Sequence, residues 1–193
     1  MKLRLFAAVV VLALTTVAAH AQIGIYANPI ATRVSLSTPD TGPFAFLGPN
    51  SKSQMFYGIN LGGYYDLYHQ GKIEAGIDVR DTYQRGNNAK LNSFLVGARV
   101  SAAPFVRPIK PFLQASVGVG TTTPPTNPSH VSKVEFGLFG GVDYTLARHV
   151  DFRVVEVGYS SLQTASNSTI GGTATIPSAS LISISTGLVF RFR

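Results

Sequence analysis

The chain has 193 residues, of which 45% are hydrophobic and only 13% are charged, and it contains no cysteine and no tryptophan. This composition excludes a disordered or nucleic-acid-binding tail, which needs far more charge. The lack of cysteine excludes a disulfide scaffold and a Cys-ligated zinc or iron–sulfur site. The formal net charge of +7 reflects a shortage of acids, 9 against 16 Lys and Arg, and no basic run indicates nucleic-acid binding.

Residues 1–21 have the three parts of a secretory signal peptide. Lys2 and Arg4 form a basic start, ten unbroken apolar residues follow, and an A-x-A cleavage site ends at Ala21. The apolar run is too short for the roughly 20 residues of a membrane helix. We therefore predict that the signal peptide is cleaved and that residues 22–193 form one domain.

The mature chain alternates polar and apolar residues with a period of two, and no 3.6-residue period is long enough to support a helix. All-β structure follows. In the first segment Pro29 predicts a bulge or an unpaired position, because proline cannot donate to a strand ladder. The pattern predicts eight strands, over about 22–36, 55–68, 72–83, 91–102, 109–120, 133–146, 150–159 and 180–192.

The links between these segments alternate between longer and shorter stretches. This alternation predicts an up-and-down antiparallel meander, with tight turns at one end and four long loops at the other. The links are residues 37–54, 69–71, 84–90, 103–108, 121–132, 147–149 and 160–179.

Charged residues fall on one face of the predicted strands, which is also dense in glycine. An eight-stranded barrel is just wide enough for side chains to fill. We therefore predict that these charges face a lumen, pair with one another and plug it. Glu156 joins this set only if a bulge near Val154 and Val155 shifts the register. The set holds seven basic and seven acidic residues: Lys72, Arg80, Arg99, Lys110, Lys133, Arg153, Arg191, Asp66, Glu74, Asp78, Glu135, Asp143, Asp151 and Glu156.

The opposite face carries the apolar side chains, with aromatic residues toward the strand ends. Two aromatic girdles at the membrane interfaces are expected of a transmembrane β-barrel. The predicted fold is therefore an all-β, eight-stranded antiparallel transmembrane barrel, and a soluble exported barrel or sandwich is the alternative. The predicted girdle residues are Tyr57, Tyr65, Tyr83, Phe94, Tyr144, Phe152, Tyr159 and Phe192.

With its signal peptide, eight-segment meander and alternating last strand over residues 181–192, the chain resembles the small outer-membrane β-barrels of the OmpA-like and opacity-porin type. The resemblance implies an outer-membrane location, contact with outer-membrane lipid or lipopolysaccharide, and recognition of the last strand by the barrel assembly machinery. Such strands typically end on an aromatic residue, whereas here Arg193 follows Phe192. The family has no catalytic motif.

The sequence offers little catalytic chemistry. His69 and His149 fall in predicted tight turns, where a surface role is expected. His130 lies near Ser129 and Ser132, so a lipid-acting hydrolase is conceivable, but no strong motif supports it. No metal-ligand spacing is visible, and we predict no catalytic residues, metal or cofactor.

We therefore predict a plugged barrel with an envelope-structural role or a surface-interaction role through its long loops. The candidate contact loops are 37–54, 121–132 and 160–179, and Phe44 and Phe46 in the first of them are exposed apolar candidates. No residue pattern identifies an extracellular ligand. The alternatives are a narrow porin-like pore and a lipid-acting hydrolase.

Overall fold

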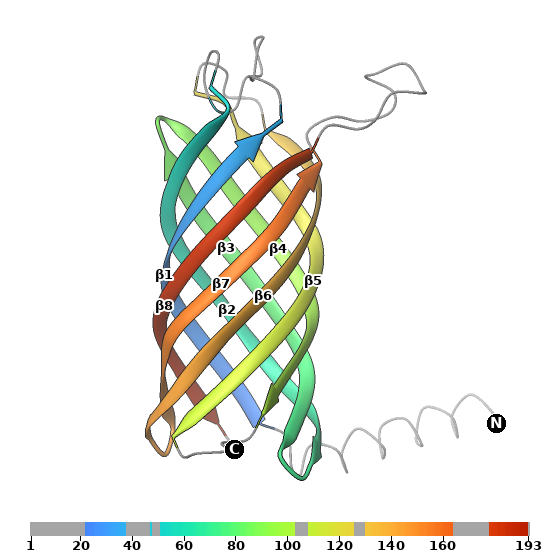
Figure 1. Cartoon of the computed structure of the whole chain (residues 1–193), viewed down its shortest axis with the longest axis vertical. Coiled ribbons are helices and arrows are strands. Elements are labelled where there is room, and N and C mark those ends of the chain that lie inside the picture. The colour runs from blue at the N-terminus through green and yellow to red at the C-terminus, as the bar shows by residue number, and fades with distance from the viewer. Residues whose placement is uncertain are drawn as a thin grey trace, which may run out of the picture.

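The computed structural model describes residues 22–37, 47, 51–102, 108–125, 130–163 and 178–192. They form a closed barrel of eight strands in chain order (Figure 1), so the predicted fold is confirmed. No helix in this described part of the chain is long and apolar enough to cross a bilayer. The strands are β1 (Gln22–Leu36), β2 (Ser53–Gln70), β3 (Ile73–Gly86), β4 (Ala89–Ala102), β5 (Ile109–Thr123), β6 (Val131–Ala147), β7 (Val150–Gln163) and β8 (Ser178–Phe192).

Every neighbouring pair of strands is antiparallel, and β1 pairs with β8 to close the barrel. The strands are strongly tilted, and β1 begins at the same end at which β8 ends (Figure 1). We call this the turn end, because two-residue turns join β2 to β3 and β6 to β7 there. The opposite end is the loop end. The predicted signal peptide, Phe44, Phe46, Ser129 and Arg193 lie outside the described residues.

Every strand except β1, which has the predicted bounds, extends further than the alternation predicted, and one predicted long loop is absent. Residues 84–90 were expected to form a loop, but β3 and β4 are joined by Asn87 and Asn88 alone. Both residues have positive φ, 48° and 64°. Asparagine tolerates this left-handed conformation, which a tight hairpin turn requires. Three longer links therefore lie at the loop end, not four.

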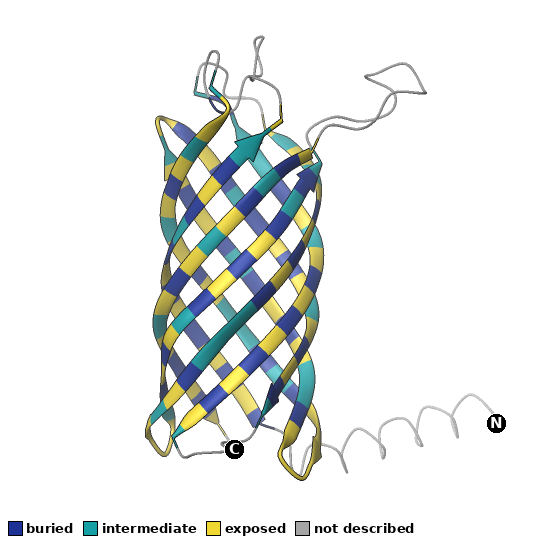
Figure 2. Ribbon diagram, in the orientation of Figure 1, coloured by how far each residue is buried: buried dark blue, intermediate teal, exposed yellow. Residues whose placement is uncertain are grey.

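Buried and exposed residues alternate along every strand (Figure 2). The exposed side is apolar: Ile59, Leu113 and Leu138 are 42%, 64% and 58% exposed. The buried side holds most of the charged residues. A water-soluble barrel would show the reverse, so this outer surface is built to face lipid.

Two irregularities interrupt the ladders of β8 at nearly the same height. Pro29 pairs with Ile59 of β2, but the β1–β8 ladder skips Asn28 and Pro29. On the other side, the β7–β8 register jumps from Arg153 to Glu156. This bulge is the one on which the inward placement of Glu156 depended, and Glu156 is buried inside the barrel.

Inward-facing glycines make room for large side chains. A Cβ atom on Gly62 would lie 2.4 Å from the Tyr26 ring, and one on Gly24 would lie 2.2 Å from the Tyr64 ring. Each tyrosine thus lies over a glycine of the neighbouring strand. The glycines on the polar face allow bulky side chains to fill a narrow interior.

Candidate functional site in the barrel lumen

A charged layer crosses the middle of the lumen. From β3, Arg80 Nη1 donates to Glu156 Oε1 of β7 over 3.1 Å, and Arg80 Nη2 donates to Gln114 Oε1 of β5 over 2.8 Å. Arg80 Nε also lies 3.5 Å from Asp78 Oδ1. In a ring of eight strands, β3 and β7 are four positions apart. The Arg80–Glu156 pair therefore spans the barrel from wall to wall.

Arg153 of β7 extends the layer toward β6. Its Nε donates to Asp143 Oδ1 over 2.9 Å, and its Nη1 donates to Glu156 Oε2 over 2.9 Å. Glu156 thus accepts hydrogen bonds from two guanidinium groups: Arg80 donates to both of its oxygens, and Arg153 donates to Oε2. Buried carboxylates need such charge-assisted bonds to offset the loss of hydration.

Aromatic rings fill the space between the guanidinium groups. Arg80 lies 3.9 Å from the centre of the Phe139 ring, and Arg99 lies 3.9 Å from that of Tyr64. Arg153 lies over both Tyr26 and Phe112, at 4.6 and 4.4 Å. These contacts are cation–π interactions, which strengthen where water is excluded. These four rings were not predicted from the sequence, although their positions on the polar faces indicate that they point inward: Tyr26, Tyr64, Phe112 and Phe139.

Further ion pairs lie toward the turn end. Arg99 Nη2 is 3.3 Å from Asp143 Oδ2, and Arg99 Nη1 is 3.7 Å from Asp66 Oδ1. The remaining pairs of Lys and Arg with acids are Lys110 with Glu74 at 3.7 Å and Arg191 with Asp151 at 2.7 Å.

Two of the basic residues predicted to belong to this network are placed differently. Lys72 lies in the exposed turn between β2 and β3, because β2 continues to Gln70 and leaves only Gly71 and Lys72 as the turn. Lys133 lies near the loop end of β6 and is only partly buried. Of the predicted set, five basic and all seven acidic side chains are buried. The buried interior of the described barrel therefore has two more acids than bases.

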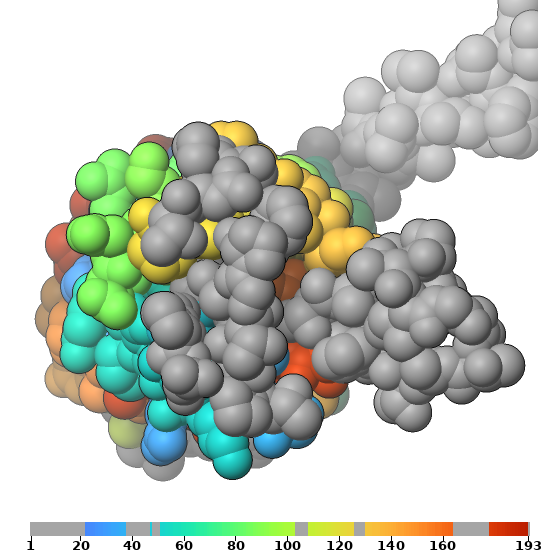
Figure 3. Space-filling view, turned by 90° about the horizontal axis from the view of Figure 1, so that it is seen from above, coloured from blue at the N-terminus to red at the C-terminus, as the bar shows by residue number. Residues whose placement is uncertain are grey.

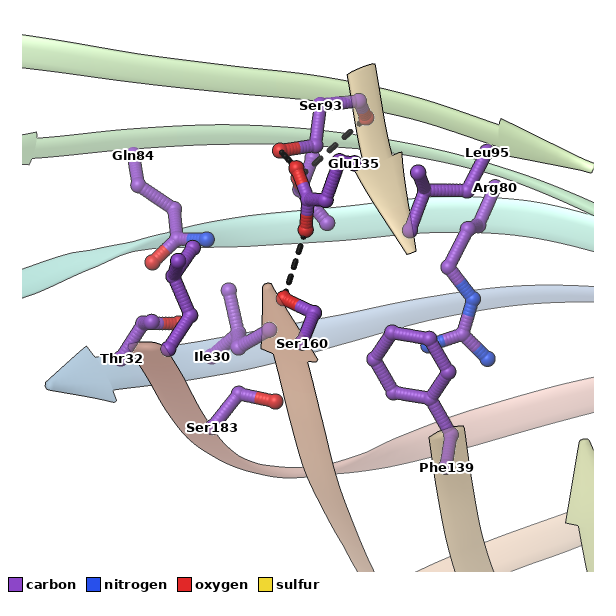
Figure 4. A pocket seen from close by; sticks show the side chains of 12 residues that line it. Ile30, Thr32, Arg80, Gln84, Ser93, Leu95, Glu135, Phe139, Ser160 and Ser183 are labelled. Carbon is purple, nitrogen blue, oxygen red and sulfur yellow. Dashed lines mark hydrogen bonds between the residues drawn. The ribbon is translucent and has the colours of Figure 1, made fainter. Parts of the chain in front are cut away.

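Glu135 is held differently from the other buried carboxylates. Ser93 donates to its Oε2 over 2.5 Å and Ser160 donates to its Oε1 over 2.7 Å (Figure 4). No ion pair joins it to a described Lys, Arg or His, whereas each of the other six acids has one.

Above the charged layer, the inner side chains at the loop end form an apolar cap. Leu47, from the link between β1 and β2, is buried among them and is 1% exposed. The coloured strand ends lie around the rim when the barrel is viewed from this end (Figure 3). The cap was not predicted from the sequence. It consists of Val34, Leu47, Phe56, Ala89, Leu91, Leu162, Ala179 and Leu181.

The predicted girdle residues point away from the lumen. Seven are exposed, and Tyr65 is half-buried. Tyr57, Tyr83, Phe94 and Tyr159 lie in the loop-end halves of their strands. The other four, Tyr65, Tyr144, Phe152 and Phe192, lie toward the turn end.

The histidines do not form a catalytic arrangement with the described residues. His130 Nδ1 lies 2.9 Å from Thr123 Oγ1, while Ser132 Oγ bonds to Thr121 Oγ1 instead. At the turn end, His69 lies 3.4 Å from Glu74, and His149 Nδ1 lies 3.1 Å from the Arg191 carbonyl oxygen. Within the described ranges, no three His, Cys, Asp or Glu residues are grouped so that they could hold a metal ion.

Comparison with known families adds to this geometry. The profile of the outer membrane protein beta-barrel domain matches residues 5–192. The chain belongs to this family. No curated protein matches it. Membership and the outward apolar surface together place this barrel in the outer membrane.

Two solved structures illustrate the similarity. Neisserial surface protein A is 15% identical with a TM-score of 0.55, and the match covers 88% of this chain and 97% of that one. Ail, the attachment invasion locus protein of Yersinia pestis, is 13% identical with a TM-score of 0.51, and the match covers 89% and 99%. At these identities the likeness concerns the fold.

Proposed function

We propose that this family member is a closed, non-conducting barrel that anchors its loop end at the outer surface of the membrane. The observation that carries the proposal is the Arg80–Glu156 pair, which links opposite walls of the lumen. Arg153 is tied to the same carboxylate and is 1% exposed. A solute crossing the lumen would have to break several buried charge-assisted bonds, each stronger than an ordinary hydrogen bond.

The apolar cap supports the same proposal from the loop end. Phe56 and Leu91 are each 0% exposed, so a hydrated ion that reached the cap would lose its water without gaining polar partners. The cap and the charged layer are two barriers in series. The competing function, a narrow porin-like pore, needs a hydrated path through both.

Planar-bilayer recording tests the plug. We expect no stable open channel for the purified protein. The double variant Arg80→Ala/Glu156→Ala removes the bridge between β3 and β7 without changing the net charge, and we expect it to raise the frequency of small openings. The matched control Lys72→Ala, in an exposed turn, should behave like the wild type. Stable open channels in the wild type would contradict the proposal.

The surface role depends on which end of the barrel faces outward. Because the chain contains no cysteine, a single introduced cysteine can be labelled selectively to measure this orientation. Lys52 is exposed beside β2 at the loop end, and Lys72 is exposed at the turn end. In intact cells, a membrane-impermeant maleimide should label Lys52→Cys and leave Lys72→Cys unlabelled until the cells are lysed. The reverse pattern would place the three longer links in the periplasm and remove the surface role.

We further propose that the molecules touched by the barrel are those of the membrane itself. The outward apolar side chains would contact acyl chains. Arg85 and Lys90, which are exposed at the loop end and paired in register, would lie near lipid or lipopolysaccharide headgroups.

The alternating outward residues Leu188, Phe190 and Phe192 of β8 would be the assembly signal. Replacing Phe192 by Ser should slow assembly in cells more than refolding in detergent.

We propose no enzymatic activity. His130 is engaged by Thr123 rather than by Ser132, and no described carboxylate orients its ring. An assay of acyl release from lipid A or phospholipid, with wild type and His130→Ala, tests this. Release by the wild type that is lost in the variant would favour the lipid-acting hydrolase.

A further inference from the structure

Glu135 is buried without a charge partner, although every other buried acid of the described lumen has one. Its side chain is 3% exposed and accepts bonds only from the hydroxyls of Ser93 and Ser160. A carboxylate removed from water costs several kcal/mol unless a positive charge lies beside it. Two hydroxyl groups carry no net charge, and Arg80 acts on Glu135 only at a distance, because no ion pair joins Glu135 to a described Lys, Arg or His.

The lumen beside Glu135 contains a small cavity, and Figure 4 shows the side chains that line it. Its volume is about 20 Å³, which is room for one water-sized particle. The lining includes Glu135, Ser93 and Ser160, together with Thr32 from β1 and Gln84 from β3. These five residues come from five strands, β1, β3, β4, β6 and β7, which surround one space.

The two serine oxygens that line the cavity keep acceptor positions free. Ser93 and Ser160 each give their single hydroxyl proton to Glu135, so only acceptor positions remain on their oxygens. Thr32 Oγ1 and Gln84 Oε1 are also buried and have no hydrogen-bond partner among the described residues, and in Figure 4 the amide nitrogen of Gln84 lies on the side of Glu135. Thr32 is 2% exposed and Gln84 is 4% exposed, so water outside the barrel does not satisfy them.

The one guanidinium group that lines the cavity is already engaged elsewhere. Arg80 uses its Nη1 atom for Glu156 and its Nη2 atom for Gln114 and Glu156. Its Nε lies beside Asp78 at 3.5 Å. Arg80 therefore belongs to the charged layer below, and turning it toward Glu135 would break the bridge between β3 and β7.

We propose that this cavity is a binding site for one monovalent metal cation, Na⁺ or K⁺. Hard cations prefer carboxylate and hydroxyl oxygens, which Glu135, Ser93 and Ser160 contribute to the lining. A single carboxylate balances a single positive charge, whereas a divalent ion would leave an uncompensated charge in a dry interior. The cavity is too small for an organic ammonium group. The site also reduces the excess of acids over bases in the lumen.

The test measures stability against the identity of the cation. The barrel, folded in detergent at constant ionic strength, is heated in NaCl, in KCl and in the chloride of the bulky cation N-methylglucamine, and unfolding is followed by gel mobility. A ligand that binds only the folded state raises the midpoint in proportion to the logarithm of its concentration above the dissociation constant. We expect a rise of several degrees in NaCl or KCl over N-methylglucamine chloride.

Two variants assign this effect to the cavity. Glu135→Gln keeps the shape and removes the charge, and it should abolish the difference between the salts. Asp151→Asn, at an acid paired with Arg191, serves as the matched control and should keep the difference although the barrel is weakened. Equal midpoints of the wild type in all three salts, or a salt difference that survives Glu135→Gln, would overturn the proposal.

Infrared spectroscopy separates the cation from a proton, the other way to neutralise Glu135. The carboxylic-acid C=O bands of the wild type and of Glu135→Gln are compared at neutral pH in NaCl. If the site holds a cation, Glu135 is ionised and the two proteins show the same bands. A band that does disappear would mean that Glu135 is protonated, and it would overturn the proposal even if the midpoints shift. Broadening of the sodium NMR line by the wild type, reduced in Glu135→Gln, is the corresponding direct signal of binding.

Discussion

The charged layer and the apolar cap fill the same lumen with opposite chemistry. The same strand can supply both, since β7 carries Arg153 in the layer and Leu162 in the cap. A change in the layer leaves a charged partner behind, whereas a change in the cap leaves a void. Substitutions in the two regions should therefore destabilise the barrel for different reasons, although the side chains are equally buried.

The two regions also differ in how they join the wall. Layer side chains reach across the barrel and connect strands that are far apart in the ring, such as β3 with β7. In the cap, Leu47 comes from a link and not from a strand, and it packs against the inner wall of the loop end. The layer thus connects distant strands through the lumen, while the cap closes the lumen at the loop end only.

The largest effect is expected in the layer, for Arg153→Ala. This substitution leaves the buried carboxylates of Asp143 and Glu156 without a shared partner and should lower the free energy of unfolding by about 3–5 kcal/mol. The measurement is urea unfolding of the barrel in lipid vesicles. Adding Glu156→Gln should recover part of the loss. A double variant that loses the sum of the two single effects would show that the layer is not a coupled network.

The next effect is expected in the cap, for Leu91→Ala, whose side chain is fully buried. The lost burial and the cavity together should cost about 2–5 kcal/mol. Leu91→Met, of similar volume, should cost less than about 1.5 kcal/mol and serves as the control. Unlike the layer, the cap should show no recovery when a neighbour such as Leu162 is also truncated. If the double truncation recovered unfolding free energy in the same assay, the cap would not differ from the layer in this respect.

The outer surface provides the third contrast, because its side chains face lipid, whereas those of the charged layer and the apolar cap face the lumen. Leu138 lies in the middle of β6 and Leu146 lies beside its turn-end terminus, and both are 58% exposed. Leu138→Arg should cost about 2–4 kcal/mol, and Leu146→Arg only about 0–1 kcal/mol, because the penalty falls toward the interface. Heat-dependent gel mobility in lipid vesicles reports the difference. Equal tolerance at the two positions would argue against a lipid-facing surface.

The smallest effect is expected for Lys72→Ala. The side chain is exposed in the turn, so its removal should change the free energy of unfolding by no more than about 0.5 kcal/mol. Arg99→Ala, which removes a base buried beside Asp143 and Asp66, is the comparison and should cost several times more. A large loss of unfolding free energy for Lys72→Ala would show that this lysine belongs to the charges that stabilise the lumen.

The β-structure and the sides of its strands could be read from the sequence by itself. Both depend on the two-residue period, which is a local property of the chain. Arg80 and Asp78 were therefore assigned to the glycine-rich face that lines the lumen, and the apolar side chains to the opposite one. The bulge at Val154 and Val155 was anticipated as the condition under which Glu156 points inward.

Only the tertiary structure decided which inward side chains meet. Arg80 and Glu156 are 76 residues apart and lie on opposite walls, and no local pattern encodes that distance. The same holds for the hydroxyls that surround Glu135 and for Leu47 in the cap. Strand ends were also beyond the pattern, since alternation fades in turns: β2 runs to Gln70 and leaves Lys72 outside. The period of a strand is set by its own backbone, whereas the filling of a lumen is set by the register, tilt and closure of all eight strands together.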